Sequence, residues 1–220
     1  DVWHKDVRLY EIYDKKNNLR GKFYFDLYAR QNKRGGAWMD ECIQRREKLN
    51  GKIQSPVAFI TCNSSPPTKK SPAFFTHYDV ETLFHEFGHG LQHMLTTINY
   101  AGISGISGVE WDAVELPSQF MENWCWEKNV LDTFAFHYKT KKKLPSALFK
   151  KLLATKNYNT GLALLRQIEF SLFDFLLHMD EKNKKTKLAE HILRDVRKET
   201  AMLPIHENNK FENSFAHIFS

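Results

Sequence analysis

The spacing of apolar and polar residues in the first third of the chain predicts a small β-sheet. Residues 7–13 alternate apolar with polar side chains, residues 14–18 have the composition of a turn, and residues 21–28 are rich in aromatic side chains. This order predicts a β-hairpin. A third apolar, β-prone run at 56–62 ends in the loop-forming residues 63–67, so we expect a third strand there.

After residue 79 the period changes to that of a helix. Apolar side chains recur at helical spacing at Val80, Leu83, Phe84, Phe87, Leu91 and Leu95. This pattern predicts an amphipathic helix, for which Asp79 is a suitable N-cap. Similar patterns predict later helices at 114–128, 144–154, 159–178 and 187–199. The expected fold is mainly α with a small β-sheet. Residues 1–78 form the sheet and loops, and residues 79–220 form helices. The sequence shows no internal repeat and no clear domain boundary.

Composition narrows the classes of protein that this chain can be. The 220 residues are 42% hydrophobic and 26% charged, which is ordinary for a soluble globular protein and excludes a disordered chain. No apolar run approaches the roughly 20 residues that span a bilayer, so we expect no membrane partner. The chain begins without an initiator methionine or a signal sequence, and we expect it to be an internal piece of a longer protein.

Cysteine content and charge favour a cytoplasmic protein without a nucleic-acid partner. Three cysteines at irregular spacing predict neither a disulfide framework nor a redox motif. The net charge of +6 includes lysine-rich runs at 139–143 and 182–187, but no recognised nucleic-acid module accompanies them. We therefore interpret these runs as solvated faces and not as parts of a basic nucleic-acid-binding domain.

The predicted helix carries a metal-binding pattern, His85-Glu86-Phe87-Gly88-His89. A separation of four residues is about 400° of rotation and roughly 6 Å of rise, so both imidazoles project from one face and suit one zinc ion. Glu86 lies about 100° round the helix from His85, where it can hold a water molecule without binding the metal. The pattern alone is not decisive, because an amphipathic helix with two surface histidines also has it.

A catalytic zinc ion needs a third protein ligand. His93 lies about 12 Å along the helix axis from His85, too far for one ion, so we interpret it as a surface or supporting residue. The remaining candidates are the carboxylates Glu110, Glu115, Glu122 and Glu127. Glu115 is preferred because it begins the next helix after a loop long enough to turn the chain back. Glu122 shares its helix face and is the supporting residue or the fallback ligand; the alternative is that both are solvated carboxylates.

Three motifs together resemble a known family. They occupy residues 84–89, residues 104–108 and residues 111–124, which read WDAVELPSQFMENW. They resemble the thimet oligopeptidase and oligopeptidase A family of zinc metallopeptidases, and most closely its bacterial members. The resemblance is specific because the last motif is long and ungapped, and it extends over residues 1–220, only part of a typical member.

The resemblance implies a zincin of the gluzincin type. In such a protein His85, His89 and Glu115 bind one zinc ion per chain, Glu86 is the catalytic base, and a mostly helical fold with a small sheet lies beside a deep channel.

Two further positions have family counterparts near the active site. Asp112 matches an acidic position beside the zinc-binding glutamate, from which we expect a hydrogen bond to a ligand imidazole; an ordinary acid at a helix N-terminus is the alternative. His217 also matches a position near the active site. The chain ends at Ser220, before the Gly- and Tyr-rich stretch that closes over substrate in the family.

The expected function is that of a zinc-dependent metalloendopeptidase acting on short peptides, with Glu86 taking a proton from an activated water molecule. The expected protein is a cytoplasmic monomer. The main alternative is a zinc-binding but catalytically incompetent fragment that lacks the substrate-closing segment. An aminopeptidase of the gluzincin type is a further alternative, although no element that would capture a substrate N-terminus is recognisable.

Overall fold

The computed structural model describes residues 1–179, 188–215 and 218. The chain forms two compact units, residues 1–146 and residues 147–220, each described by itself below. Within the described ranges, no helix is both long and apolar enough to cross a membrane. The chain is mostly helical with a small sheet, as the sequence predicts.

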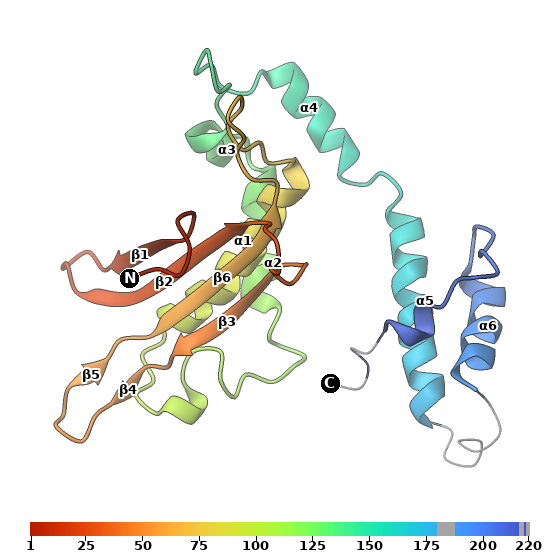
Figure 1. The fold of residues 1–220 in the computed structure, drawn as a ribbon, viewed down its shortest axis with the longest axis horizontal. Helices are drawn as coiled ribbons and strands as arrows, with labels where there is room; N and C mark the ends of the chain where they lie inside the picture. The colour runs from red at the N-terminus through yellow and green to blue at the C-terminus, as the bar shows by residue number, and fades with distance from the viewer. Residues whose placement is uncertain (180–187, 216–217, 219–220) are drawn as a thin grey trace. The chain divides into compact units, whose positions relative to one another are not determined.

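A four-stranded sheet dominates the first unit (Figure 1). Its order is β1 (Arg8–Tyr13), β2 (Leu19–Tyr28), β6 (Val57–Ser64) and β3 (Trp38–Ile43). Strand β2 pairs antiparallel with β1 and parallel with β6, and β6 pairs antiparallel with β3. A separate short ribbon pairs β4 (Arg46–Glu47) with β5 (Ile53–Gln54). The predicted hairpin and third strand are confirmed.

Strand β3 was not predicted from the sequence. The adjacent acids Asp40 and Glu41 interrupt any alternation of apolar and polar residues. Such charges are common on edge strands, where one side of the strand is left unpaired. The pairing of Trp38 with Thr61 and of Met39 with Ile60 therefore depends on β6 and not on a local pattern.

The long helix α1 (His77–Met94) begins earlier than predicted. Its N-cap is Thr76, not Asp79 as the sequence suggested: Thr76 Oγ1 accepts a hydrogen bond from the Asp79 N–H at 3.1 Å. The Asp79 carboxylate accepts one in return from the Thr76 N–H at 2.8 Å. Asp79 is thus the third helical residue of a capping box, which satisfies two N–H groups at the start of the helix.

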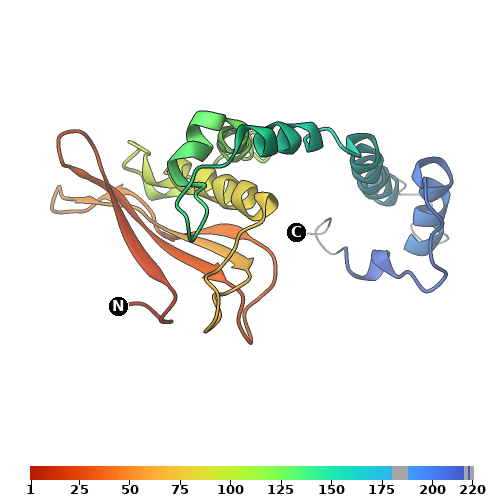
Figure 2. The same ribbon diagram turned by 90° about the horizontal axis from the view of Figure 1, so that it is seen from above.

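Helix α1 packs on one face of the sheet (Figure 2). The core between them consists of Phe23, Ala58, Ile60 and Met94, all buried. Burial of each large side chain of this kind contributes about 1.5–3 kcal/mol. The contact fixes the orientation of α1, and so decides which of its faces is turned away from the core.

A single helix at 114–128 was predicted, but this segment is broken into shorter pieces. Helix α2 (Leu116–Glu122) runs into the 3-10 turn η2 (Asn123–Trp126), and α3 (Lys128–Phe134) follows. Glu127, between the last two, has the extended backbone angles φ −94° and ψ 120°. The Asn123 side chain donates to the carbonyl of Gln119 at 3.2 Å and to that of Phe120 at 3.1 Å, and so satisfies acceptors at the end of α2.

The second unit consists mainly of helices. Helix α4 (Ser146–Thr155) begins at the boundary, and α5 (Thr160–Met179), α6 (Ala189–Thr200) and the 3-10 turn η3 (Phe211–Asn213) follow. Helices α5 and α6 pack on each other and bury Phe173 and Leu193. The buried Glu169 of α5 joins them, because its Oε1 accepts from Arg197 Nε of α6 at 2.9 Å.

Candidate metal centre

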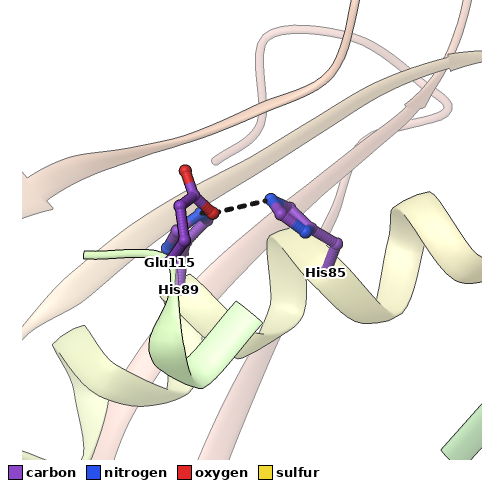
Figure 3. Close-up of side chains that lie close together, drawn as sticks. All are labelled: His85, His89 and Glu115. Carbon is purple, nitrogen blue, oxygen red and sulfur yellow. Dashed lines mark ion pairs between the residues drawn. The ribbon is translucent and has the colours of Figure 1, made fainter. Parts of the chain in front are cut away.

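Three side chains from two helices converge in the first unit (Figure 3). His85 and His89 lie one turn apart on α1, and Glu115 is the N-cap residue of α2. Glu115 Oε2 lies 3.2 Å from His85 Nε2 and 3.2 Å from His89 Nε2. One ligand atom of each residue lies within 4.8 Å of the others. In the part of the chain that the structure describes, no other three His, Cys, Asp or Glu side chains converge in this way.

The spacing of these atoms fits a zinc ion. Zinc binds histidine nitrogen and carboxylate oxygen at about 2.0–2.2 Å in a tetrahedron, whose ligand atoms are then about 3.4 Å apart. The two nitrogen-to-oxygen separations of 3.2 Å are close to this value. Two histidines and one glutamate are also a known ligand set of catalytic zinc, and they leave a fourth position for water.

Glu122 supports His85 from the far side of its ring. Glu122 Oε1 lies 2.6 Å from His85 Nδ1. A hydrogen bond at Nδ1 fixes the tautomer, because it leaves Nε2 free of a proton and able to bind a metal. Glu122 is therefore not among the three converging ligands; its contact is with the opposite ring nitrogen.

Burial keeps His89 suited to metal binding. The residue is 8% exposed, and this burial lowers the pKa of its imidazole against the opposing effect of Glu115. A lower pKa favours the neutral form, which is the form that binds metals. Its Nδ1 is buried and has no hydrogen-bond partner among the described residues, so Nε2 is the ring nitrogen that contacts another group of the site.

Glu86 is next to the first histidine but takes no part in the three-residue group. It is 7% exposed, and burial raises the pKa of its carboxyl, whereas His85 and a hydrogen bond from the backbone of Met39 lower it. The net shift is upward. A carboxylate that binds protons more readily than usual is suited to general-base catalysis near neutral pH.

The other predicted residues lie elsewhere. Asp112 is exposed in the turn before α2, and no hydrogen bond joins it to an imidazole within the described ranges; Glu122 makes that contact. His217 lies outside the described residues. His93 is fully buried and not on the helix surface, and its Nε2 lies 3.0 Å from the carbonyl oxygen of Ile43.

Two contributors were missed from the sequence. The backbone of Met39 in β3 supports Glu86, and a backbone contact leaves no signal in the residue type. Ser118 donates a hydrogen bond to Glu115 Oε2 at 2.7 Å. Its position three residues after Glu115, one turn along a predicted helix, was the signal that could have identified it.

Two histidines and one glutamate that converge from two helices are the ligand set of a metallopeptidase-type site. A family model described as Peptidase family M3 matches residues 1–220, and the chain belongs to this family. The family resemblance expected from the motifs is confirmed.

Curated relatives match this chain along its whole length. It is 55% identical to Oligopeptidase A of Escherichia coli (strain K12) over 220 residues, which cover 100% of this chain and 32% of the relative. It is 43% identical to an organellar oligopeptidase A of Arabidopsis thaliana, over 100% of this chain and 28% of the relative. It is 34% identical to Dipeptidyl carboxypeptidase of Escherichia coli (strain K12), over 99% of this chain and 32% of the relative. The chain thus spans about a third of the length of these relatives.

Proposed function

We propose that this protein is a zinc-dependent metalloendopeptidase that hydrolyses internal bonds of short peptides. The observation that carries the proposal is the position of Glu115 Oε2, 3.2 Å from the Nε2 atoms of both histidines. His85, His89 and Glu115 would hold one zinc ion per chain. Membership of Peptidase family M3 supports peptide hydrolysis as the reaction.

The side chains around the ion would have different roles in the reaction. When bound, zinc would supply Lewis-acid activation of a water molecule and of the scissile carbonyl. Glu86 would take the proton from the attacking water and pass it to the departing amine, as a general base and then a general acid. Glu122 would keep His85 in the metal-binding tautomer.

The substrate class comes from the relatives. Oligopeptidase A and Thimet-like oligopeptidase are the names of proteins 55% and 39% identical to this chain. We therefore propose oligopeptides as substrates. Cys42, Cys62 and Cys125 are all free thiols, which favours the reducing cytoplasm as the location. A monomeric state remains a prediction.

A second candidate is a zinc-binding protein without peptidase activity. The observation that favours it is that the three converging side chains account for metal binding by themselves, whereas peptide cleavage also needs a general base and donors to the oxyanion. Its zinc affinity would match that of the first candidate, and its turnover would not.

One experiment separates the two candidates. Zinc per chain is measured by elemental analysis, and cleavage of an internally quenched peptide, blocked at both ends, is followed before and after removal of metal by a chelator. We expect one zinc per chain and cleavage that stops on chelation and returns with zinc. Full zinc with no cleavage would favour the second candidate, and absence of zinc binding would contradict both.

A further inference from the structure

The environment of Glu115 shows what holds the third ligand in place. We propose that Ser118 is a positioning residue that orients the Glu115 carboxylate, and that Gly88 makes this possible by letting α2 contact α1. The inference rests on the proposed metal centre and adds a residue to it.

Ser118 contacts the ligand atom itself. Its Oγ lies 2.7 Å from Glu115 Oε2, the same oxygen that is 3.2 Å from each histidine Nε2. The hydroxyl also lies 2.9 Å from the Glu115 backbone carbonyl. That carbonyl already accepts a hydrogen bond from the Gln119 N–H at 2.9 Å. Donation to the carboxylate is the stronger choice, because hydrogen bonds to ionised acceptors are about twice as strong as neutral ones.

Glu115 needs such a partner because little else restrains it. Its side chain is 49% exposed, against 26% for that of His85 and 10% for that of His89. Fixing a long, exposed glutamate in one rotamer has a cost in side-chain entropy, which a hydrogen bond to the carboxylate offsets. Among the described residues, Ser118 is the side chain that donates a hydrogen bond to its carboxylate, and the two imidazoles face the same oxygen as fellow metal ligands. Without Ser118, the carboxylate would be free to turn toward solvent.

Gly88 places Ser118 at the required depth. A Cβ atom at Gly88 would lie 2.6 Å from the Ser118 Cα and 2.6 Å from the Pro117 carbonyl oxygen. The backbones of α1 and α2 therefore touch at this point, between the turns that carry His85 and His89. Ser118 is fully buried by this contact and has little freedom to move. The glycine inside the histidine motif thus sets the distance between the ligand-bearing helices.

The first test is the zinc affinity of Ser118→Ala, measured by competition with a fluorescent chelator. The substitution removes one oxygen, adds no bulk, and leaves the Glu115 carbonyl paired with Gln119. We expect zinc to bind about 10- to 100-fold more weakly, the usual effect of losing a group that orients a ligand. Should Ser118→Ala fail to fold, Ser118→Gly removes the same hydroxyl and carries the same expectation.

Ser104→Ala is the matched control. Ser104 is also a fully buried serine of the first unit, and its hydroxyl has no hydrogen-bond partner within the described residues. We expect its zinc affinity to equal that of the wild type. Thermal melting of the zinc-free proteins shows whether each variant is folded; equal loss of zinc affinity in both variants would overturn the role of Ser118.

A double-mutant cycle with Glu115→Ala decides whether Ser118 acts through Glu115. In the Glu115→Ala background, Ser118→Ala should cause no further loss of zinc affinity, and a further loss of 10-fold would overturn the inference. If Glu115→Ala weakens zinc binding and Ser118→Ala does not, only this inference fails. If Glu115→Ala leaves zinc binding unchanged, the proposed metal centre itself is wrong.

Discussion

Glu122 Oε1 lies 2.6 Å from Nδ1 of His85, on the side of the ring opposite to the converging ligand atoms. The two residues are 37 positions apart and belong to different helices. The contact links the orientation of an imidazole on α1 to the position of α2. It also separates the roles of the two glutamates, since Glu115 approaches Nε2 of the same ring.

Glu122→Gln should weaken zinc binding by about 10- to 100-fold without abolishing it, because a neutral amide is a poorer partner for the imidazole than a carboxylate. Zinc affinity is measured by chelator competition. Glu127→Gln is the control, since Glu127 is exposed beyond the end of α2 and should leave the affinity unchanged. Wild-type affinity in Glu122→Gln would show that the contact is not needed for binding.

Glu115→Gln should cost more zinc affinity than Glu122→Gln, because it replaces a negatively charged ligand with a neutral one. We expect a loss larger than the 10- to 100-fold that is usual for supporting residues. Zinc content after dialysis against a weak chelator measures it. The reverse order, with zinc kept in Glu115→Gln and lost in Glu122→Gln, would exchange the roles of the two residues.

Glu86→Gln should keep zinc and lose turnover. The residue is not part of the converging group, and a positioned general base contributes about 10²- to 10⁴-fold to rate. Zinc content and peptide cleavage are measured on the same preparation of the variant. The wild-type protein, prepared in the same way, must cleave the peptide. Normal cleavage at full zinc occupancy would rule out Glu86 as the base.

Gly88→Ala should destabilise the protein and weaken zinc binding together. The added methyl would lie 2.6 Å from backbone atoms of α2, and overpacking of this kind costs about 1–3 kcal/mol. Gly161→Ala in α5 is the matched control, since nothing lies within 4 Å of a Cβ there. It should be neutral or stabilising by up to about 1 kcal/mol. Urea unfolding and zinc titration of both variants provide the comparison.

The stability of the first unit should fall in acid as Asp26 is protonated. Burial opposes ionisation of this side chain, but hydrogen bonds from Arg30 at 2.6 Å and Lys33 at 2.9 Å outweigh it and lower the pKa to about 2. Because this pKa is lower in the folded state than in the unfolded state, the ionised Asp26 carboxylate contributes its full stabilisation above about pH 4. This contribution to the unfolding free energy is lost as the pH falls toward 2. It amounts to roughly 2 kcal/mol.

Asp26→Asn checks this prediction. Its unfolding free energy should be lower than that of the wild type at pH 7, and the difference should shrink between pH 4 and pH 2. Asp112→Asn is the control, because Asp112 is exposed in the turn before α2. A difference that does not change with pH would mean that the ionised form of Asp26 is not what stabilises the fold.

The sequence by itself determined the features that depend on neighbours along the chain. The spacing of His85 and His89 places both rings on one helix face, because an α-helix has a fixed pitch. Alternation in β1, aromatic residues in β2 and the apolar run of β6 identified three strands, since each of these signals lies within its own segment. The ends of helices were predicted less accurately. The start of α1 is set by reciprocal hydrogen bonds between Thr76 and Asp79, which the apolar spacing did not indicate.

Only the tertiary structure decided which carboxylate meets the histidines. Four glutamates were candidates, and the choice depends on how closely α2 approaches α1, which is set at Gly88 and Ser118. The same approach assigns the imidazole contact to Glu122 and leaves Asp112 exposed. Strand β3 likewise exists through its pairing with β6. Contacts between distant segments depend on the packing of whole elements, and a local pattern of residue types does not encode them.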